Sequence, residues 1–338
     1  MPREPLLPVT HLLTQCDGMA RDKDSRTLAA LRSATFDARG QFRSPTENVG
    51  DLQTIHSGIC HGTLGELFQG PYIQDDELHI SLISLPIKKY SFVHFACGEN
   101  GHINVDLTDK KKSRRAIDIY LSRHQIRLPS GKWTYDSELI QGKGMASSTA
   151  DIVATIRCLD AIFKRKSSIK SISRILREVE RSDSVFLDTY ALYLSGQQEV
   201  IHCFGFDPKF YVCYIDEGDA IDTEKAGAPL LAYYERNLSA YLTNLDRAVN
   251  GFLECNLPEI ARCATASATL AQGVIPKRNL DIMLSRQSRF KADGIVVAHT
   301  GSLLGYLYVQ KPSHTEMGEL SSFFHGLGYQ CRFVQTGF

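Results

Sequence analysis

The sequence predicts an α+β protein, because strand-like and helix-like segments are mixed along the chain without a regular strand–helix repeat. Residues 80–107 are rich in β-branched and aromatic side chains, which favour strands. Residues 149–180 instead carry apolar side chains at helical spacing. The chain has 338 residues, of which 43% are hydrophobic, so it can bury one large core or two modest ones.

The N-terminal residues 1–53 differ from the rest of the chain. Residues 21–43 are rich in charge, and only residues 28–31 suggest a short amphipathic helix. We therefore predict an N-terminal arm of unknown role in front of a compact domain. The arm could cap a binding site, join a second protomer in a homodimer or remain mobile, and the sequence leaves these three roles open.

The compact part is predicted to begin with a β-meander. We expect strands over residues 80–85, 91–96 and 102–107. Residues 99–101 predict a hairpin turn between the last two strands, because Asn and Gly tolerate the positive φ angles of a tight turn. Two amphipathic helices come next, over residues 149–163 and 169–180, each with one apolar face for the sheet.

A domain boundary is predicted at Asp207 and Pro208, a turn pair between two strand-like segments. It divides the compact part into domains at residues 54–206 and 207–338. The elements expected around and beyond it are strands at residues 200–206 and 210–215, helices at 233–253 and 260–272, strands at 294–299 and 304–309, a helix at 316–326 and a strand at 330–334.

Composition disfavours several kinds of partner. Lys plus Arg and Asp plus Glu each number 38, so no net field attracts nucleic acid or an anionic membrane. No segment approaches the ~18 consecutive apolar residues of a membrane helix. The nine cysteines include no C-x-x-C pair and the histidines no H-E-x-x-H, which disfavours a zinc site. We predict a cytoplasmic protein without nucleic-acid or membrane partners.

Residues 141–150, QGKGMASSTA, form a small-residue loop that leads into a predicted helix. Its glycines let the backbone approach a bulky anion, and the helix start offers unpaired N–H groups. The hydroxyls of Ser147 and Ser148 can donate to phosphate or ligate Mg²⁺. A plain helix cap after a flexible turn is the alternative interpretation. The chain has no G-x-x-x-x-G-K-[ST] motif and no complete G-x-G-x-x-G, which disfavours Walker and dinucleotide-binding proteins.

The loop resembles a motif of the GHMP kinase superfamily, named for galactokinase, homoserine, mevalonate and phosphomevalonate kinases. Residues 144–150, GMASSTA, resemble its second motif, typically GLGSSAA, with Ala146 in place of the second Gly. Ala resists the positive φ that Gly allows. Residues 62–70, GTLGELFQG, are similar to the first motif, and residues 291–305, KADGIVVAHTGSLLG, to the third. Each segment alone could be a Gly-rich turn or a buried strand, but three in the family's order favour the family.

The resemblance covers residues 55–338 and looks closest to the L-threonine kinases of cobalamin synthesis. It implies a two-domain fold, with a ribosomal S5 domain 2-like N-terminal part and a ferredoxin-like α/β C-terminal part. It also implies ATP and Mg²⁺ as cofactors and a hydroxy amino acid as substrate, with L-threonine converted to O-phospho-L-threonine. The alternatives are a kinase for another small alcohol or acid, and a degenerate member that binds a ligand without catalysis.

The resemblance further implies roles for individual residues. Asp183 resembles the aspartate that faces the acceptor hydroxyl in many GHMP kinases and is expected to be the base; a helix cap is its alternative role. Glu180 or Glu178 is expected to ligate Mg²⁺ with Ser148, or else to lie on a solvated helix face. The expected ATP-binding residues are Lys143, Gly144, Met145, Ala146, Ser147, Ser148, Thr149, Thr300 and Gly301. The expected substrate-binding residues are Gly65, Glu66, Gln69 and His299, the last of which could equally be structural.

Overall fold

The computed structural model describes residues 54–98, 107, 109–218 and 227–338. The predicted arm lies outside these residues, as do the predicted hairpin turn at residues 99–101 and nearly all of the predicted strand at 102–107. The described fold belongs to the unit Gln53–Phe338. None of the helices described is long and apolar enough to cross a membrane.

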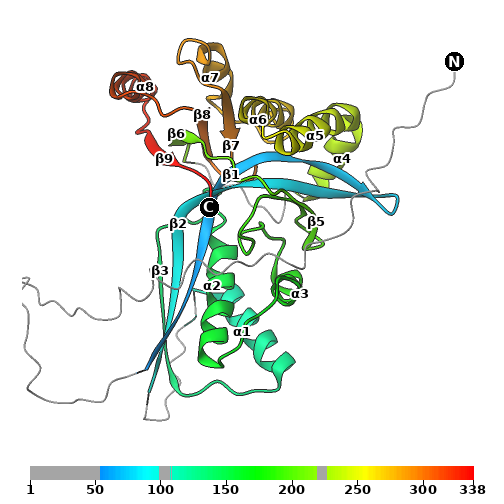
Figure 1. Cartoon of the computed structure of the whole chain (residues 1–338), viewed down its shortest axis with the longest axis vertical. Coiled ribbons are helices and arrows are strands. Elements are labelled where there is room, and N and C mark those ends of the chain that lie inside the picture. Colours follow the sequence, from blue (N-terminus) through cyan, green and yellow to red (C-terminus); the bar gives the residue numbers. More distant parts are fainter. Residues whose placement is uncertain (1–53, 99–106, 108, 219–226) are drawn as a thin grey trace, which may run out of the picture. The chain divides into compact units, whose positions relative to one another are not determined.

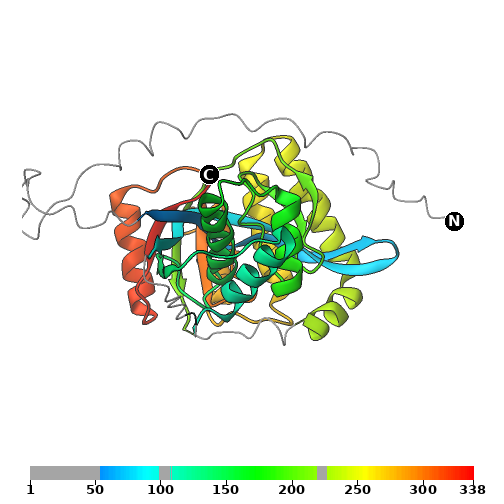
Figure 2. The same cartoon turned by 90° about the horizontal axis from the view of Figure 1, so that it is seen from below.

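The described residues contain one antiparallel sheet with the strand order β5-β4-β2-β1-β7-β8-β6-β9, and β3 also pairs with β2. Its strands are β1 Ile55–Gln74, β2 Glu77–Cys97, β3 Gly131–Ser137, β4 Ala191–Leu194, β5 Glu199–Cys203, β6 Tyr211–Asp216, β7 Gly294–Val297, β8 Leu303–Tyr308 and β9 Arg332–Gln335. The long strands β1 and β2 form a central ribbon to which the other strands attach (Figure 1). Figures 1 and 2 both show the hairpin end of this ribbon extending past its neighbours.

Helices lie beside both halves of the ribbon and beside the shorter strands. They are α1 Lys111–His124, α2 Ser147–Ile162, α3 Ile169–Val179, α4 Gly227–Arg236, α5 Leu238–Leu253, α6 Leu257–Ala271, α7 Leu280–Arg286 and α8 His314–Gly326. Helices α1, α2 and α3 gather beside the half that carries β3, and α4, α5 and α6 lie at the other half (Figure 1). Strands and helices are mixed without a βα repeat, so the predicted α+β class is confirmed.

Several predicted elements differ from the structure. The strands expected at residues 80–85 and 91–96 are one strand, β2, because Lys88 and Lys89 form a bulge where Ile87 and Tyr90 pair with neighbouring residues of β1. The helix expected at residues 233–253 is two helices that meet at Asn237. Helices α1 and α7 and strands β1, β3 and β4 were not predicted. The boundary at residue 207 stays a prediction; both sides of it contribute strands to the same sheet.

The segments that resemble the three motifs meet at the centre of the fold. The Thr63 and Gly65 N–H groups donate to the carbonyls of Met145 and Gly144, each at 3.1 Å, and so join the first motif to the second. A Cβ atom on Gly144 would lie 2.1 Å from Ala298 Cβ in the third motif. Because Gly144 also has a φ of 90°, only glycine fits at this crossing.

Helix α2 begins directly after this crossing. Ala146 precedes it with a φ of 54° and a ψ of 29°, the left-handed conformation that an alanine resists. No side chain caps the helix, and its first hydrogen bond runs from the Ala150 N–H to the Ala146 carbonyl at 2.9 Å. The strained residue therefore sets the direction in which α2 leaves the loop.

Ala146→Gly should raise the free energy of unfolding by about 1 kcal/mol, because glycine adopts the left-handed conformation without a Cβ clash. Urea denaturation measures this change. Ala161→Gly is the matched control: Ala161 is an exposed helical residue of the same helix, and its replacement should instead lower stability by up to about 1 kcal/mol. Equal losses from both variants would show that Ala146 stores no strain.

Candidate active site

A cavity of about 170 Å³ brings together residues from all three motif segments and from the chain after α3. Its lining includes Glu66, Gln69, Gly144, Met145, Ala146, Ser147, Ser148, Thr149, Glu180, Asp183 and Thr300, all expected from the sequence. The structure adds Leu82, Lys112, Gly142, Arg181, Ser182 and Ser195 to this lining. The other expected residues, Lys143, Gly65, His299 and Gly301, lie behind the lining and support it.

The start of α2 gives the cavity an anion-binding character. The N–H groups of Ser147, Ser148 and Thr149 precede the first helical hydrogen bond, so the helix itself supplies them with no acceptor. The positive end of the helix dipole lies at the same place, and both features favour phosphate oxygens. The predicted phosphate loop thus has free N–H groups and a positive dipole end, the two features that an anion-binding loop requires.

Contacts behind this loop hold it in position. The Lys143 Nζ donates to the Gly218 carbonyl at 2.7 Å and lies 3.4 Å from Asp216 Oδ2, so it points toward the end of β6 instead of the cavity. The buried Lys277 Nζ donates to the Gly301 carbonyl. Burial lowers the pKa of Lys277 to about 8. Sequence reasoning missed Lys277, because nothing around it resembles a motif.

Glu180 ends α3 and reaches the start of α2. Its carboxylate accepts hydrogen bonds from Ser148 Oγ and Thr149 Oγ1, each at 2.9 Å, and from Lys112 Nζ at 2.7 Å. Carboxylate and hydroxyl oxygens are ligands that Mg²⁺ prefers, so Glu180 and Ser148 fit the metal that the family implies. Glu178 instead pairs with Arg123 at the surface, so of these two glutamates Glu180 is the one that lines the cavity.

Asp183 faces the cavity from the segment after α3. Burial and the negative charge of Glu66 raise the pKa of Asp183 to about 7, although Arg181 acts in the opposite direction. A carboxylate that titrates near neutral pH suits general base catalysis. The alternative role as a helix cap is wrong, since residues 184–194 form turns and β4 instead of a helix.

The far side of the cavity is polar and fixed. Glu66 Oε2 accepts from the His299 N–H at 3.0 Å and lies 2.9 Å from His299 Nδ1, while His299 Nε2 lies 3.0 Å from Ser267 Oγ. The amide of Gln69 donates to the Tyr234 hydroxyl at 3.1 Å. His299 is buried and reaches the cavity only through Glu66, so it orients that carboxylate instead of lining the site.

Arg181 is one of the cavity residues whose role sequence reasoning did not identify. It lines the cavity next to Asp183, and the described residues give its guanidinium no hydrogen-bond or ion-pair partner. A guanidinium in this position can bind a planar anion with two parallel hydrogen bonds. The sequence offered one signal for a site role, the position of Arg181 between Glu180 and Asp183. An arginine on the surface could occupy the same position, so this signal was not decisive.

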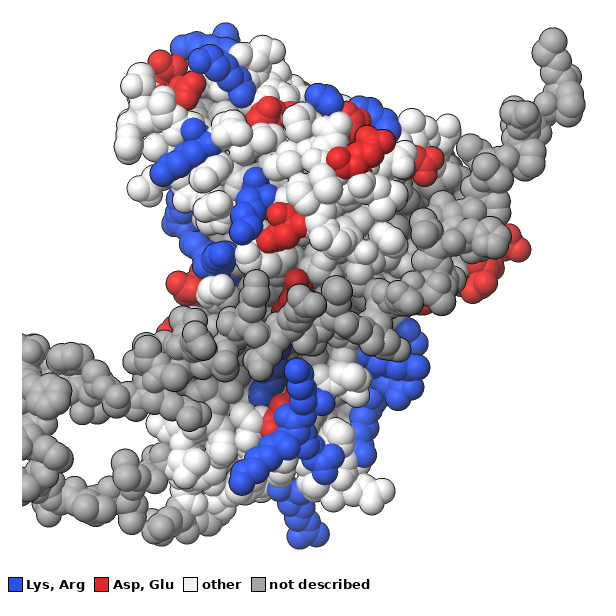
Figure 3. All heavy atoms as spheres, in the orientation of Figure 1, with Lys and Arg blue, Asp and Glu red and all other residues white. Residues whose placement is uncertain are grey.

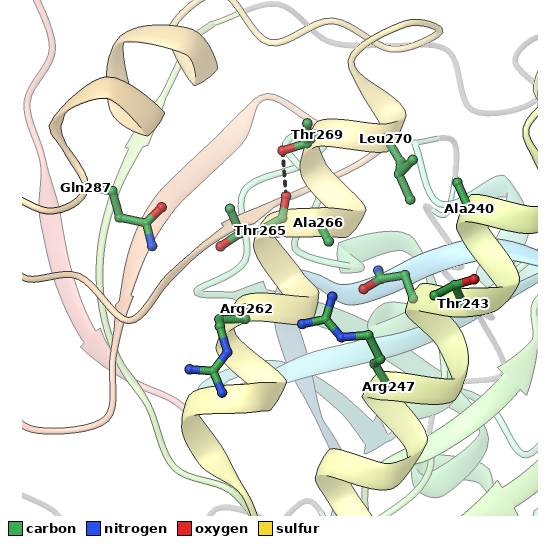
Figure 4. A pocket seen from close by; sticks show the side chains of 10 residues that line it. Ala240, Thr243, Arg247, Arg262, Thr265, Ala266, Thr269, Leu270 and Gln287 are labelled. Atoms are coloured by element: carbon green, nitrogen blue, oxygen red, sulfur yellow. Dashed lines mark hydrogen bonds between the residues drawn. The ribbon is translucent and has the colours of Figure 1, made fainter.

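A larger hollow of about 560 Å³ lies between α5, α6 and the turn at Gln287 (Figure 4). It contains no residue of the three motif segments. Its two arginines, Arg247 and Arg262, both pair with Glu259, at 2.7 and 2.6 Å. We assign the chemistry to the smaller cavity, because only that cavity combines a phosphate loop with carboxylates.

Comparisons with known proteins agree with this geometry. Two curated relatives, the L-threonine kinases of Citrobacter freundii and Salmonella typhimurium, are each 23% identical to the chain. The alignments cover 73% and 75% of the chain and 84% and 82% of the relatives. Residues 112–196, which contain the phosphate loop, Glu180 and Asp183, match the family described as the GHMP kinases N terminal domain. These residues resemble the GHMP kinases, and both curated relatives are small-molecule kinases.

Solved structures show that the chain has the fold of GHMP kinases. Mevalonate kinase from L. major superposes with a TM-score of 0.62 at 13% identity, covering 86% of this chain and 98% of that one. Homoserine kinase from Cytophaga hutchinsonii gives a TM-score of 0.60 at 13% identity, covering 86% and 97%. The likeness spans the N-terminal and C-terminal halves of the described fold.

In the ligand-free protein, the Asp183 carboxyl should titrate near pH 7. In Glu66→Gln its pKa should fall, because a negative neighbour is removed, but stay above the ordinary value of 3.8, because burial remains. Carboxyl ¹³C NMR, assigned with Asp183→Asn, measures both values. Glu178→Gln, at the surface pair with Arg123, should leave the pKa of Asp183 unchanged. An ordinary aspartate titration in the wild type would contradict the environment described.

Proposed function

We propose that this GHMP kinase transfers the γ-phosphoryl group of ATP, with Mg²⁺, to the side-chain hydroxyl of a small hydroxy amino acid, with L-threonine as the first candidate. The observation that carries the proposal is the cavity in which Asp183, Glu66 and Arg181 lie beside the phosphate loop. The names of the two curated relatives support the same acceptor.

The charges of the cavity suit a zwitterion. Glu66 offers an anionic partner for an ammonium group, and Arg181 offers a cationic partner for a carboxylate. Asp183 lies next to Arg181 and is the expected acceptor of a hydroxyl proton. A sugar or an isoprenoid alcohol would leave at least one of these charged groups without a partner, which is costly in a buried site.

In the proposed reaction the hydroxyl oxygen of the acceptor attacks the γ-phosphorus of ATP, the bond from this phosphorus to the β-phosphate oxygen breaks, and ADP leaves. Asp183 accepts the proton that the hydroxyl loses. The α2 N–H groups and Thr300 hold the phosphate chain, and Glu180 with Ser148 would hold Mg²⁺, which neutralises phosphate charge. The residues act mainly by positioning the reactants and balancing charge.

The loop gives no support to a degenerate, non-catalytic member. Ala146 is the departure from the family motif that raised this alternative. It adopts the positive φ that a glycine would adopt there, and α2 begins directly after it. The same residue lines the cavity together with Ser147 and Ser148.

Release of ADP from ATP and Mg²⁺, screened across L-threonine, L-serine, L-homoserine, sugars and mevalonate, tests the proposal, with mass spectrometry of each product. Phosphothreonine is the expected product. Phosphorylation of a sugar or of mevalonate would overturn the amino-acid acceptor while keeping the kinase. Nucleotide binding without ADP release from any acceptor would contradict catalysis on these substrates.

Arg181→Met should raise KM for the amino acid about tenfold or more while KM for ATP changes little, because a charge-assisted hydrogen bond to the acceptor carboxylate is lost. Steady-state kinetics with each substrate varied in turn measure the split. Arg177→Met is the control: Arg177 lies outside the cavity and donates to the Gln197 carbonyl. Equal changes in both KM values would show that Arg181 does not bind the acceptor.

Asp183→Asn should lower kcat by about 10²–10⁴-fold, the usual contribution of a general base. In the wild type, kcat/KM should fall as the pH drops below about 7, because protonated Asp183 cannot accept the proton. The asparagine variant should lose this pH dependence. Asp188→Asn, at a side chain that is 91% exposed, should keep both the rate and the profile. An unchanged rate in Asp183→Asn would remove the base from the mechanism.

A further inference from the structure

The N-terminal turn of α1 carries the charge opposite to the one that a helix dipole favours. It has no acidic residue, and Lys110, Lys111, Lys112 and Arg114 lie close together at its start. Cations at this end of a helix are unfavourable unless anions lie close by. In Figure 3, Lys and Arg side chains gather over the part of this face where Figure 1 shows α1, α2 and α3. The cluster therefore needs an anionic partner.

Two buried carboxylates contact this cluster. Lys110 Nζ lies 2.5 Å from Asp151 Oδ2, and Lys112 Nζ lies 2.7 Å from Glu180 Oε2. The Asp151 carboxylate also accepts from Ser91 Oγ at 2.5 Å and lies outside the cavity lining. Lys112 and Glu180 both line the cavity. The second pair is thus the one that a bound nucleotide would meet.

Glu180 joins the first turns of two helices. Its Oε2 accepts from Lys112 of α1 and from Ser148 of α2, and its Oε1 accepts from Thr149 of α2. Its side chain is 6% exposed, whereas that of Lys112 is 43% exposed. A buried carboxylate without a cation is costly, so Lys112 stabilises Glu180 in the ligand-free enzyme. The exposed lysine, on its flexible stem, is the partner that can leave.

We propose that Lys112 is a nucleotide-binding residue that neutralises Glu180 in the free enzyme and moves to the phosphate chain when the Mg²⁺–nucleotide complex binds. Mg²⁺ bound to Glu180 would lie close to the ammonium on the same oxygen, and the two cations repel each other. Phosphate oxygens held at the start of α2, on the same cavity wall, would offer the ammonium a new anionic partner. The Glu180 carboxylate would thus pair with Lys112 in the free enzyme and with Mg²⁺ when the nucleotide is bound.

This inference rests on the proposed Mg²⁺–nucleotide site and is independent of the acceptor. The test compares Lys112→Met with Lys111→Met, the exposed neighbour on the same helix turn. Thermal unfolding is recorded without ligand and with Mg²⁺ alone. Binding of the non-hydrolysable analogue AMPPNP is measured by calorimetry with Mg²⁺ and with EDTA.

Lys112→Met should lower the ligand-free melting temperature, and Mg²⁺ alone should restore it, because the metal replaces the missing cation at Glu180. The wild type and Lys111→Met should gain much less from Mg²⁺ alone, since Lys112 already occupies the carboxylate. Affinity for Mg²⁺–AMPPNP should fall about tenfold in Lys112→Met, the loss expected for one charge-assisted hydrogen bond, and remain unchanged in Lys111→Met.

If Lys112→Met does not fold alone, the double variant with Glu180→Gln removes the unpaired carboxylate and should restore folding, with no stabilisation by Mg²⁺. The proposal is overturned if Lys112→Met binds Mg²⁺–AMPPNP as the wild type does, or if Mg²⁺ alone stabilises both equally. If the wild type binds no AMPPNP, the proposed function fails, and the comparison with Mg²⁺ alone still decides whether Lys112 and the metal compete for Glu180.

Discussion

The close crossing of three backbone segments at Gly144 is the constraint on which the site depends. The Gly65 N–H donates to the Gly144 carbonyl, and a Cβ atom on Gly301 would lie 2.3 Å from the Lys143 carbonyl. The segments come from β1, from the loop before α2 and from the loop between β7 and β8, so the crossing ties both halves of the ribbon together. Because Glu66 and Thr300 are next in sequence to crossing residues, packing at the centre brings both of them into the lining of one cavity.

The sequence predicted much of this site, because glycines and small hydroxyl residues at a helix start have a physical meaning that one sequence reveals. Asp183, Glu180 and the phosphate loop do share a cavity, as expected. Lys112 was missed since α1, with a charged first turn and few apolar positions, gave no periodic signal, and β3 was missed since four of its seven residues are exposed. Their structure is set by pairing with β2 and by packing on α2, which local propensity does not record.

The sequence also did not show which residues line the cavity and which support the lining from behind. Lys143 and His299 lie in motif-like segments, yet one contacts Asp216 and the other orients Glu66 from behind. Conversely, Lys277 and Arg181 lie outside the three motif segments. Lys277 supports the third segment through the Gly301 carbonyl, and Arg181 lines the cavity. These roles depend on which side of a loop a side chain leaves, and this is set by the tertiary packing of segments far apart in the chain.

Charge balance links the acceptor wall to the base. Asp183 has a raised pKa because it is buried near Glu66, and Arg181 partly offsets that effect. An acceptor ammonium at Glu66 would neutralise the negative neighbour and lower the pKa of Asp183, whereas an acceptor carboxylate at Arg181 would neutralise the positive one and raise it. A zwitterion would therefore neutralise both Glu66 and Arg181, with opposing effects on the pKa of Asp183. An acceptor with only one of the two charges would shift this pKa in one direction. In the proposed reaction, the same three residues would couple recognition of the acceptor to the protonation state of the base, and selectivity and catalysis would depend on a single electrostatic arrangement.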